Sequence, residues 1–210
     1  MNKAFKVGEI VTMTNLELFP MRATSRQQGA SLIMVLLILV VVSVLGAGGA
    51  QIAIMSERGA RNDRDQQVAW QAAEAALIDA EVDMIDTTST RQTVFDSKNL
   101  IPFETGCGTT GNSVGLCALN LTGKPAWLTA DFTIATGTSV MTTGLGAFTG
   151  RTFAAGVVGI QPAQVPRYVI EIIPDPIGDK SKPTFMYRVT AMGFGPRQDI
   201  QAVVQMIYRI

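Results

Sequence analysis

The sequence predicts an α+β fold in which one long N-terminal helix packs on an antiparallel C-terminal sheet. Three observations support this class: an apolar stretch of membrane length, a stripe of small residues at helical spacing after it, and three strand-like segments near the C-terminus. We expect residues 1–29 to be a leader, residues 30–55 and 56–86 to be two halves of the helix, and residues 87–210 to be a globular head.

The apolar stretch is long enough to cross a bilayer. Ser43 is the only polar residue between Leu32 and Leu45, and residues 52–55 are apolar again. About 20 apolar residues span the hydrocarbon core as a helix. Exposure of such a surface to water costs ~25 cal/mol per Å². The stretch is therefore expected in lipid, in a protein core or against similar helices.

Gly46, Gly48 and Gly49 lie inside this apolar half. Each glycine weakens a helix by about 1 kcal/mol relative to alanine. Two explanations stay open. The segment unwinds or bends when the protein leaves the bilayer, or the small residues allow another helix to approach closely.

The polar half of the helix has two recognisable faces. Glu57, Arg61 and Asp65 are spaced to pair along an exposed face. Small and apolar residues recur at spacings of three and four, which predicts a stripe that packs on a sheet. These residues are Ala69, Ala72, Ala73, Ala76, Leu77, Ala80 and Met84.

The composition argues against several classes of function. Lys+Arg and Asp+Glu both number 17, so general nucleic-acid binding is not expected. The chain contains 0 His, which removes the commonest general base and transition-metal ligand. We find no nucleophile–base pair and no phosphate-binding loop, and therefore expect no enzyme and no cofactor. The Asp175–Asp179 loop offers two carboxylates, too few for calcium unless backbone oxygens complete the site, and a turn is favoured over a metal site.

The head contains two cysteines and three strand-like segments. Cys107 and Cys117 bracket a loop of turn-forming residues, and a structural disulfide is expected if this part lies outside the cytoplasm. Residues 127–136 alternate as a short strand does. Residues 137–159 are rich in Gly, Thr and Ala, and are expected to form a flexible surface region, either an interaction loop or a plain connector. The strands are expected at Arg167–Ile173, Phe185–Gly193 and Ile200–Ile210.

The stretch RQQGASLIMVLL resembles the start of a type IV prepilin, in which a basic leader ends in Gly before an uninterrupted apolar helix. The resemblance implies that prepilin peptidase cleaves between Gly29 and Ala30 and that Ala30 is N-methylated. Leaders of such proteins are usually short, and a start at Met21 gives MRATSRQQG, so Met1, Met13 and Met21 are all candidate starts.

Met34 departs from the usual prepilin pattern, which has Glu as the fifth mature residue. In the family, that Glu pairs with the N-terminal amine of a neighbouring subunit. Its absence is found in PilX-type minor pilins and in K-type minor pseudopilins of type II secretion. A subunit with nothing above it needs no buried carboxylate, so Met34 implies a place at or near the filament tip. The alternative is a plain membrane anchor.

Residues 65–81, together with RYVIE, YRVTAMGFG and the terminal strand, resemble PilX-type minor pilins. The resemblance implies a non-catalytic protein that helps prime type IV pilus assembly, anchored in the inner membrane with its head in the periplasm and later part of the pilus. Implied partners are the major pilin, other minor pilins, a tip adhesin and prepilin peptidase.

Two other functions remain open. The first is a minor pseudopilin of type II secretion. The second is a secreted periplasmic binding protein, because Ala47–Ala50 offers small residues for signal peptidase cleavage near residue 50.

Overall fold

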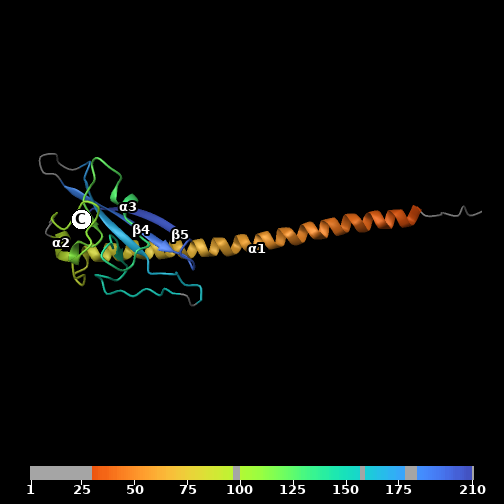
Figure 1. Ribbon diagram of the computed structural model, residues 1–210, viewed down its shortest axis with the longest axis horizontal. Helices are drawn as coiled ribbons and strands as arrows, with labels where there is room; N and C mark the ends of the chain where they lie inside the picture. Colours follow the sequence, from red (N-terminus) through yellow and green to blue (C-terminus); the bar gives the residue numbers. More distant parts are fainter. Residues whose placement is uncertain (1–29, 97–99, 157–158, 178–183, 210) are drawn as a thin grey trace, which may run out of the picture. The chain divides into compact units, whose positions relative to one another are not determined.

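The computed structural model describes residues 30–96, 100–156, 159–177 and 184–209. The chain divides into two units, residues 1–52 and 53–210, and each is described by itself. The predicted α+β class is confirmed (Figure 1). The elements in chain order are α1 (Ala30–Ile85), α2 (Gln92–Asp96), the 3-10 turn η1 (Gly111–Ser113), β1 (Leu116–Cys117), α3 (Ala126–Thr129), β2 (Thr143–Gly144), β3 (Arg167–Pro174), β4 (Phe185–Phe194) and β5 (Gln201–Tyr208).

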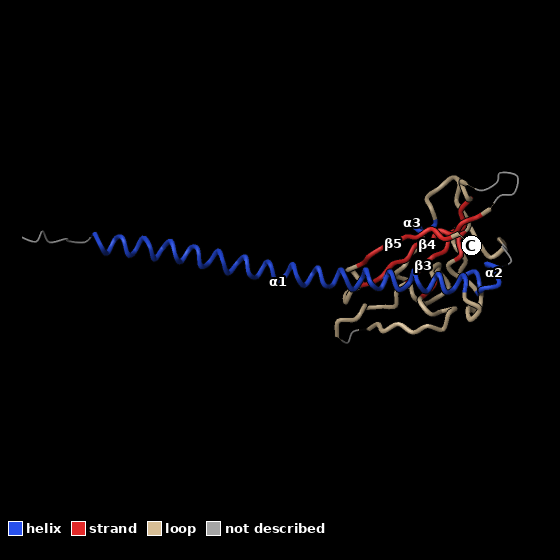
Figure 2. The backbone as a smooth tube through the Cα atoms, turned by 180° about the vertical axis from the view of Figure 1, so that it is seen from behind, coloured by secondary structure: helices blue, strands red, loops and turns tan. Residues whose placement is uncertain are grey.

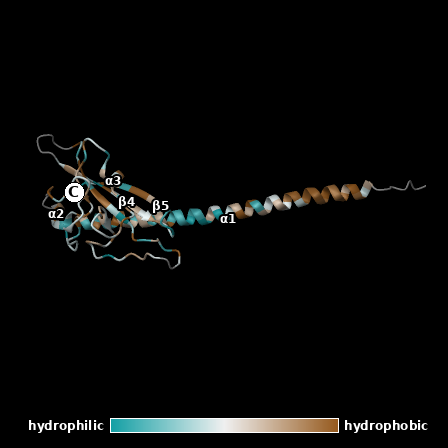
Figure 3. Ribbon diagram, in the orientation of Figure 1, coloured by the Kyte–Doolittle hydropathy of each residue, from teal (hydrophilic) through white to brown (hydrophobic). Residues whose placement is uncertain are grey.

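The described part of the first unit, residues 30–52, is entirely helical and belongs to α1. Figure 3 shows that most residues of the helix there are hydrophobic. Polar residues become frequent only in the later part of α1, where the helix enters the second unit. The predicted long N-terminal helix with an apolar first half is therefore confirmed.

The head contains a sheet built around β3. The strand order is β1-β3-β4-β5, and β2 also pairs with β3. The pairs β3–β4 and β4–β5 are antiparallel, as the three strand-like segments predicted. β1 runs parallel to β3 opposite Ile170 and Glu171, and β2 runs antiparallel to β3 opposite Arg167 and Tyr168. These two short strands therefore share the edge of β3 that faces away from β4.

The second half of α1 covers one face of the sheet (Figure 2). The predicted alanine stripe is confirmed, because Ala69, Ala72, Ala73, Ala76 and Ala80 are all buried. On the sheet they meet alternate residues of β3 and β4, with the ring of Phe95 closing one end. The buried members of this core on the strands are Tyr168, Ile170, Ile172, Tyr187, Val189 and Ala191.

Small side chains bring α1 close to the sheet backbone at Gly193. A Cβ atom added at Gly193 would lie 2.1 Å from the carbonyl oxygen of Ala69 and 2.2 Å from the amide nitrogen of Ala73. The obstacles are helix backbone atoms, which no rotamer change can move. Gly193 is therefore where the helix and β4 approach most tightly, and it is part of the helix docking surface.

The opposite face of the sheet is covered by residues 126–133, and the sequence pattern predicted a short strand at residues 127–136. That prediction is wrong: Ala126–Thr129 form the short helix α3, and the chain then turns. The amide of Ala126 donates to Glu171 at 3.1 Å, and Phe132 is 3% exposed beneath the segment. The turn lets Ala126 and Phe132 both face inward, whereas Leu128 is 54% exposed.

The Gly- and Thr-rich region was predicted to be a flexible surface segment, and part of it is instead built into the head. Thr142 and Thr143 are 0% and 1% exposed, and Thr143 begins β2. The amide of Gly146 donates to Asp79 of α1 at 2.8 Å. The composition that favours loops also supplies small hydroxyl side chains that fit against buried charged groups.

The substitution Gly193→Ala is expected to destabilise the head by about 1–3 kcal/mol, because the added methyl group overpacks against helix backbone. The measurement is urea denaturation of the full chain in detergent micelles. Gly59→Ala is the matched control, since a Cβ there meets nothing within 4 Å and alanine favours the helix. Equal stability of the two variants would contradict the close approach.

Candidate functional site

The first candidate surface is the apolar half of α1. No charged residue occurs between Ala30 and Ser56. Its large side chains are exposed, from 49% at Val41 to 71% at Leu32. Ser43 donates to the carbonyl oxygen of Leu39 at 2.7 Å, so its hydroxyl group needs no partner from lipid. Among the described residues, α1 is the one helix that is both long enough and apolar enough to span a membrane.

The residues that the sequence singled out lie along this helix without meeting one another. Ala30 is the first residue of α1, whereas Gly29 and the predicted leader lie outside the described residues. Met34 is 65% exposed. Its side chain therefore belongs to a surface available to lipid or to another helix.

Gly46, Gly48 and Gly49 are helical. A Cβ at any of them would meet nothing within 4 Å. Contacts within this chain therefore do not account for the three glycines. Unwinding and close packing against another helix both remain predictions.

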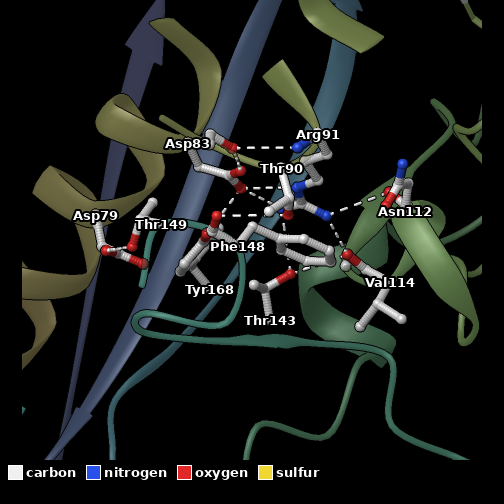
Figure 4. A network of polar contacts seen from close by, with 12 residues as sticks. Asp79, Asp83, Thr90, Arg91, Asn112, Val114, Thr143, Phe148, Thr149 and Tyr168 are labelled. Carbon is white, nitrogen blue, oxygen red and sulfur yellow. Dashed lines mark hydrogen bonds and ion pairs between the residues drawn. The ribbon is translucent and has the colours of Figure 1, made fainter. Parts of the chain in front are cut away.

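The second candidate site is a buried ion pair at the end of α1 (Figure 4). The carboxylate of Asp83 accepts from Nε of Arg91 at 2.8 Å and from a terminal nitrogen of the same guanidinium group. It also accepts from the hydroxyl groups of Ser89 and Tyr168, each at 2.8 Å. The Asp83 and Arg91 side chains are both 0% exposed. Burial raises the pKa of Tyr168 well above 10, so its hydroxyl group stays protonated and keeps donating.

The remaining donors of Arg91 reach two other segments. One terminal nitrogen donates to the carbonyl oxygens of Val114 at 2.6 Å and Asn112 at 3.4 Å. The other donates to the hydroxyl group of Thr143 at 3.4 Å. The ring of Phe148 lies 3.8 Å from the guanidinium carbon. Every N–H of Arg91 therefore has an acceptor, as a buried guanidinium group requires.

Asp79 lies one turn earlier on α1 and binds the loop that follows β2. Its carboxylate accepts from the hydroxyl group of Thr149 at 2.6 Å and from the amide of Gly146 at 2.8 Å. Arg151 lies 3.8 Å away. Asp79 thus joins residues 146–149 to the helix directly, and Asp83 is linked to Thr143 through Arg91. We call Asp79, Asp83, Arg91, Thr143, Thr149 and Tyr168 the helix-end network.

This network was not predicted from the sequence, although a signal was present. Asp79 and Asp83 follow Ala72 and Ala76 at helical spacing, so they lie on the stripe predicted to be buried. A carboxylate on a buried stripe needs a cationic or hydrogen-bonding partner. Arg91 could have been suggested as that partner, but the acceptors at Val114 and Thr143 depend on the folded chain.

A second buried pair and the disulfide hold the other face of the sheet. Glu171 accepts from Arg188 at 2.8 and 3.0 Å and from the amide of Ala126. Cys107 and Cys117 form a disulfide, as predicted. This bond closes the loop whose carbonyl groups at Asn112 and Val114 bind Arg91. The two faces of the head are therefore connected through one loop.

The Asp175 loop is held by protein groups. Asp175 accepts from Arg209 at 2.8 Å, from the amide of Ile177 at 2.9 Å and from the hydroxyl group of Thr184 at 3.2 Å. Asp179, the other carboxylate considered for calcium, lies outside the described residues. Within the described part of the chain, no group of three or more potential ligands gathers for a metal ion.

An exposed apolar helix that continues into an α+β head defines a membrane-anchored subunit of the type IV pilin class. Comparison with family models agrees with this class. A model described as PilX N-terminal matches residues 28–77, and one described as Type IV pilus assembly protein PilX C-term matches residues 104–210. The chain belongs to the PilX family of type IV pilus proteins. No curated protein and no solved structure gave a significant match.

The substitution Arg91→Leu is expected to destabilise the head by about 3–5 kcal/mol, because it leaves the buried Asp83 carboxylate without its cation. Tyr168→Phe, which removes one donor to the same carboxylate, is expected to cost only about 1 kcal/mol. Urea denaturation of the full chain in detergent micelles measures both. An Arg91→Leu variant as stable as Tyr168→Phe would show that the ion pair does not hold the head together.

Proposed function

We propose that this protein is a minor pilin that helps prime type IV pilus assembly and lies at or near the pilus tip. It acts by helix packing and by contacts of the head, not by catalysis. The family match and the exposed apolar helix support membrane anchoring followed by incorporation into a pilus. Priming and the tip position are our inference from the composition of that helix.

The observation that carries the proposal is the uncharged surface around Met34. In a pilin filament, a carboxylate at the fifth mature position pairs with the N-terminal amine of a neighbouring subunit. The proposed mature chain offers its own amine at Ala30 but has no carboxylate between Ala30 and Glu57. A carboxylate buried among helices without a cation is costly. A subunit at the filament end has no neighbour above it whose amine could pair with such a carboxylate. Met34 in place of Glu avoids the cost of leaving that carboxylate unpaired.

The proposed sequence of events begins in the inner membrane. Prepilin peptidase cleaves between Gly29 and Ala30, Ala30 is N-methylated, and residues 30–55 hold the protein in the bilayer with its head in the periplasm. The same helix then moves into the filament core, where Gly46, Gly48 and Gly49 allow bending or close packing. The major pilin, other minor pilins and a tip adhesin are the proposed partners, and the tip lies at the cell surface.

The family description favours this function over the two alternatives. A pseudopilin of type II secretion would use the same helix, but the matching C-terminal model is described as a type IV pilus assembly protein. A secreted binding protein requires cleavage near residue 50, within a helix that runs unbroken from Ala30 to Ile85. The PilX N-terminal model matches residues 28–77, which extend across that point, and this match favours a protein that keeps its apolar half.

The tip position is tested with Met34→Glu, with Met34→Leu as the matched apolar control. The new carboxylate can pair with the amine of a subunit above it, so the variant is expected along the filament shaft several-fold more often than the control. Immunogold labelling of sheared pili gives the distribution. Deletion of the protein is expected to lower the number of surface pili.

Two results would contradict the proposal. In the first, the unaltered protein is found evenly along the shaft, so Met34 does not restrict it to an end. In the second, deletion leaves the number of pili unchanged, so the protein has no priming role.

A further inference from the structure

The two edges of the sheet in the head differ in how far other strands cover them. One edge of β3 is covered by β1 and β2. The other edge belongs to β5, which pairs with β4 along its whole length and ends the strand order. Within the described residues, no strand pairs with the outer side of β5. An edge strand presents unpaired amide and carbonyl groups that can bind another strand.

The hydrogen-bond pattern shows which groups of β5 point outward. The amide of Gly195 donates to the carbonyl oxygen of Ile200 at 2.8 Å, just before β5 begins. Hydrogen-bonded pairs in an antiparallel ladder recur at every second residue. The backbone groups of Val203, Gln205 and Ile207 therefore point away from β4. Consistent with this phase, the carbonyl oxygen of Gln201 accepts from the side chain of Gln66 at 3.3 Å.

β5 lacks the features that usually keep an edge strand from pairing. Its sequence, QAVVQMIY, contains no charged residue, no proline and no glycine. Its register with β4 is continuous from Gln201 to Tyr208, so no bulge turns the edge away. Val203 and Ile207 are 44% and 62% exposed on the face of the sheet opposite α1. Exposed edges in soluble proteins are normally protected by Lys, Pro or a bulge.

A groove lies beside this edge, on the same face of the sheet, opposite α1. It has a volume of about 500 Å³ and is lined by the apolar residues Trp127, Leu128, Ala130, Phe132, Met192 and Val203 and by the polar residues Thr129, Asp131, Thr133 and Gln201. A strand added next to β5 sends every second side chain to this face. The groove can therefore receive one apolar side chain, which would add selectivity to the backbone hydrogen bonds.

We propose that β5 binds an extended segment of another pilus subunit by strand addition, through the outward backbone groups of Val203, Gln205 and Ile207. The part of the segment that pairs with β5 is uncharged, because β5 itself offers no charge to pair, and it alternates apolar residues toward the groove. The inference rests on the proposed function, because a subunit present only at the tip has no second copy beside it. It assigns the surface by which the head recruits its partner.

Photo-cross-linking in piliated cells tests the proposal on the full chain. A benzophenone amino acid is placed at Val203 or Ile207, and at Leu121 as an exposed loop control, where the side chain is 85% exposed. Mass spectrometry identifies the joined peptides. The first two positions are expected to mark one short segment of a different protein, at points about four residues apart, as paired strands require. The loop control is expected not to mark that segment.

A backbone variant separates strand pairing from simple proximity. Val203→Pro removes an outward amide while leaving the ladder to β4 intact. It is expected to lower the cross-link from Ile207 about tenfold, whereas Val203→Thr, which keeps the amide, leaves it unchanged. Thermal denaturation checks that both variants fold. If the proline lowers stability, Val203→Lys serves in its place, because a lysine on the edge opposes pairing.

The outcomes separate this inference from the proposed function. A protein that reaches the pilus tip but gives no cross-link from Val203 and Ile207 overturns strand addition and leaves the proposed function standing. Cross-links to β5 of a second copy alone overturn the assignment of a different subunit as the partner. Cross-links to one segment of another protein in cells where the chain never reaches the pilus support the edge as a docking site and overturn the tip position.

Discussion

The contact between the alanine face of α1 and β4 is the constraint on which the head depends. The helix approaches so closely that Gly193 has no room for a methyl group. Such an approach buries backbone and small side chains, and larger apolar residues such as Phe95 and Tyr168 complete the core. Polar groups add contacts at the end of the helix. Asp79 and Asp83 extend from the same helix face, where Asp79 accepts from the amide of Gly146 and Asp83 accepts from the hydroxyl group of Tyr168 in β3.

This arrangement makes the end of α1 the point where the head is assembled. Arg91 is fully buried and donates hydrogen bonds to Asp83 of the helix, to Val114 in the disulfide-closed loop and to Thr143 of β2. A network of this kind is favourable only when every member is satisfied. The disulfide and the helix-end network therefore support each other, and the fold suits an oxidising compartment outside the cytoplasm.

The sequence was sufficient where the pattern is periodic. It predicted the helix, the alanine stripe, the strands after Pro166 and the disulfide, because each has a local signal. It failed at residues 127–133, where alternation suggested a strand but Glu171 holds a helical turn. It also failed at Thr142 and Thr143, whose burial depends on Arg91 and Arg167, far away in the sequence. Only part of the helix-end network could be predicted, from the carboxylates of Asp79 and Asp83 on a buried stripe.

One helix serves two environments in this account: its apolar half lies in lipid or among other helices, and its second half builds the head. The central claim is that the mature protein keeps that apolar half and begins with it. Mass spectrometry of the N-terminal peptide from purified membranes tests this claim most directly. The account predicts a mature chain that begins at N-methylated Ala30, and a chain that begins near Gln51 would contradict it.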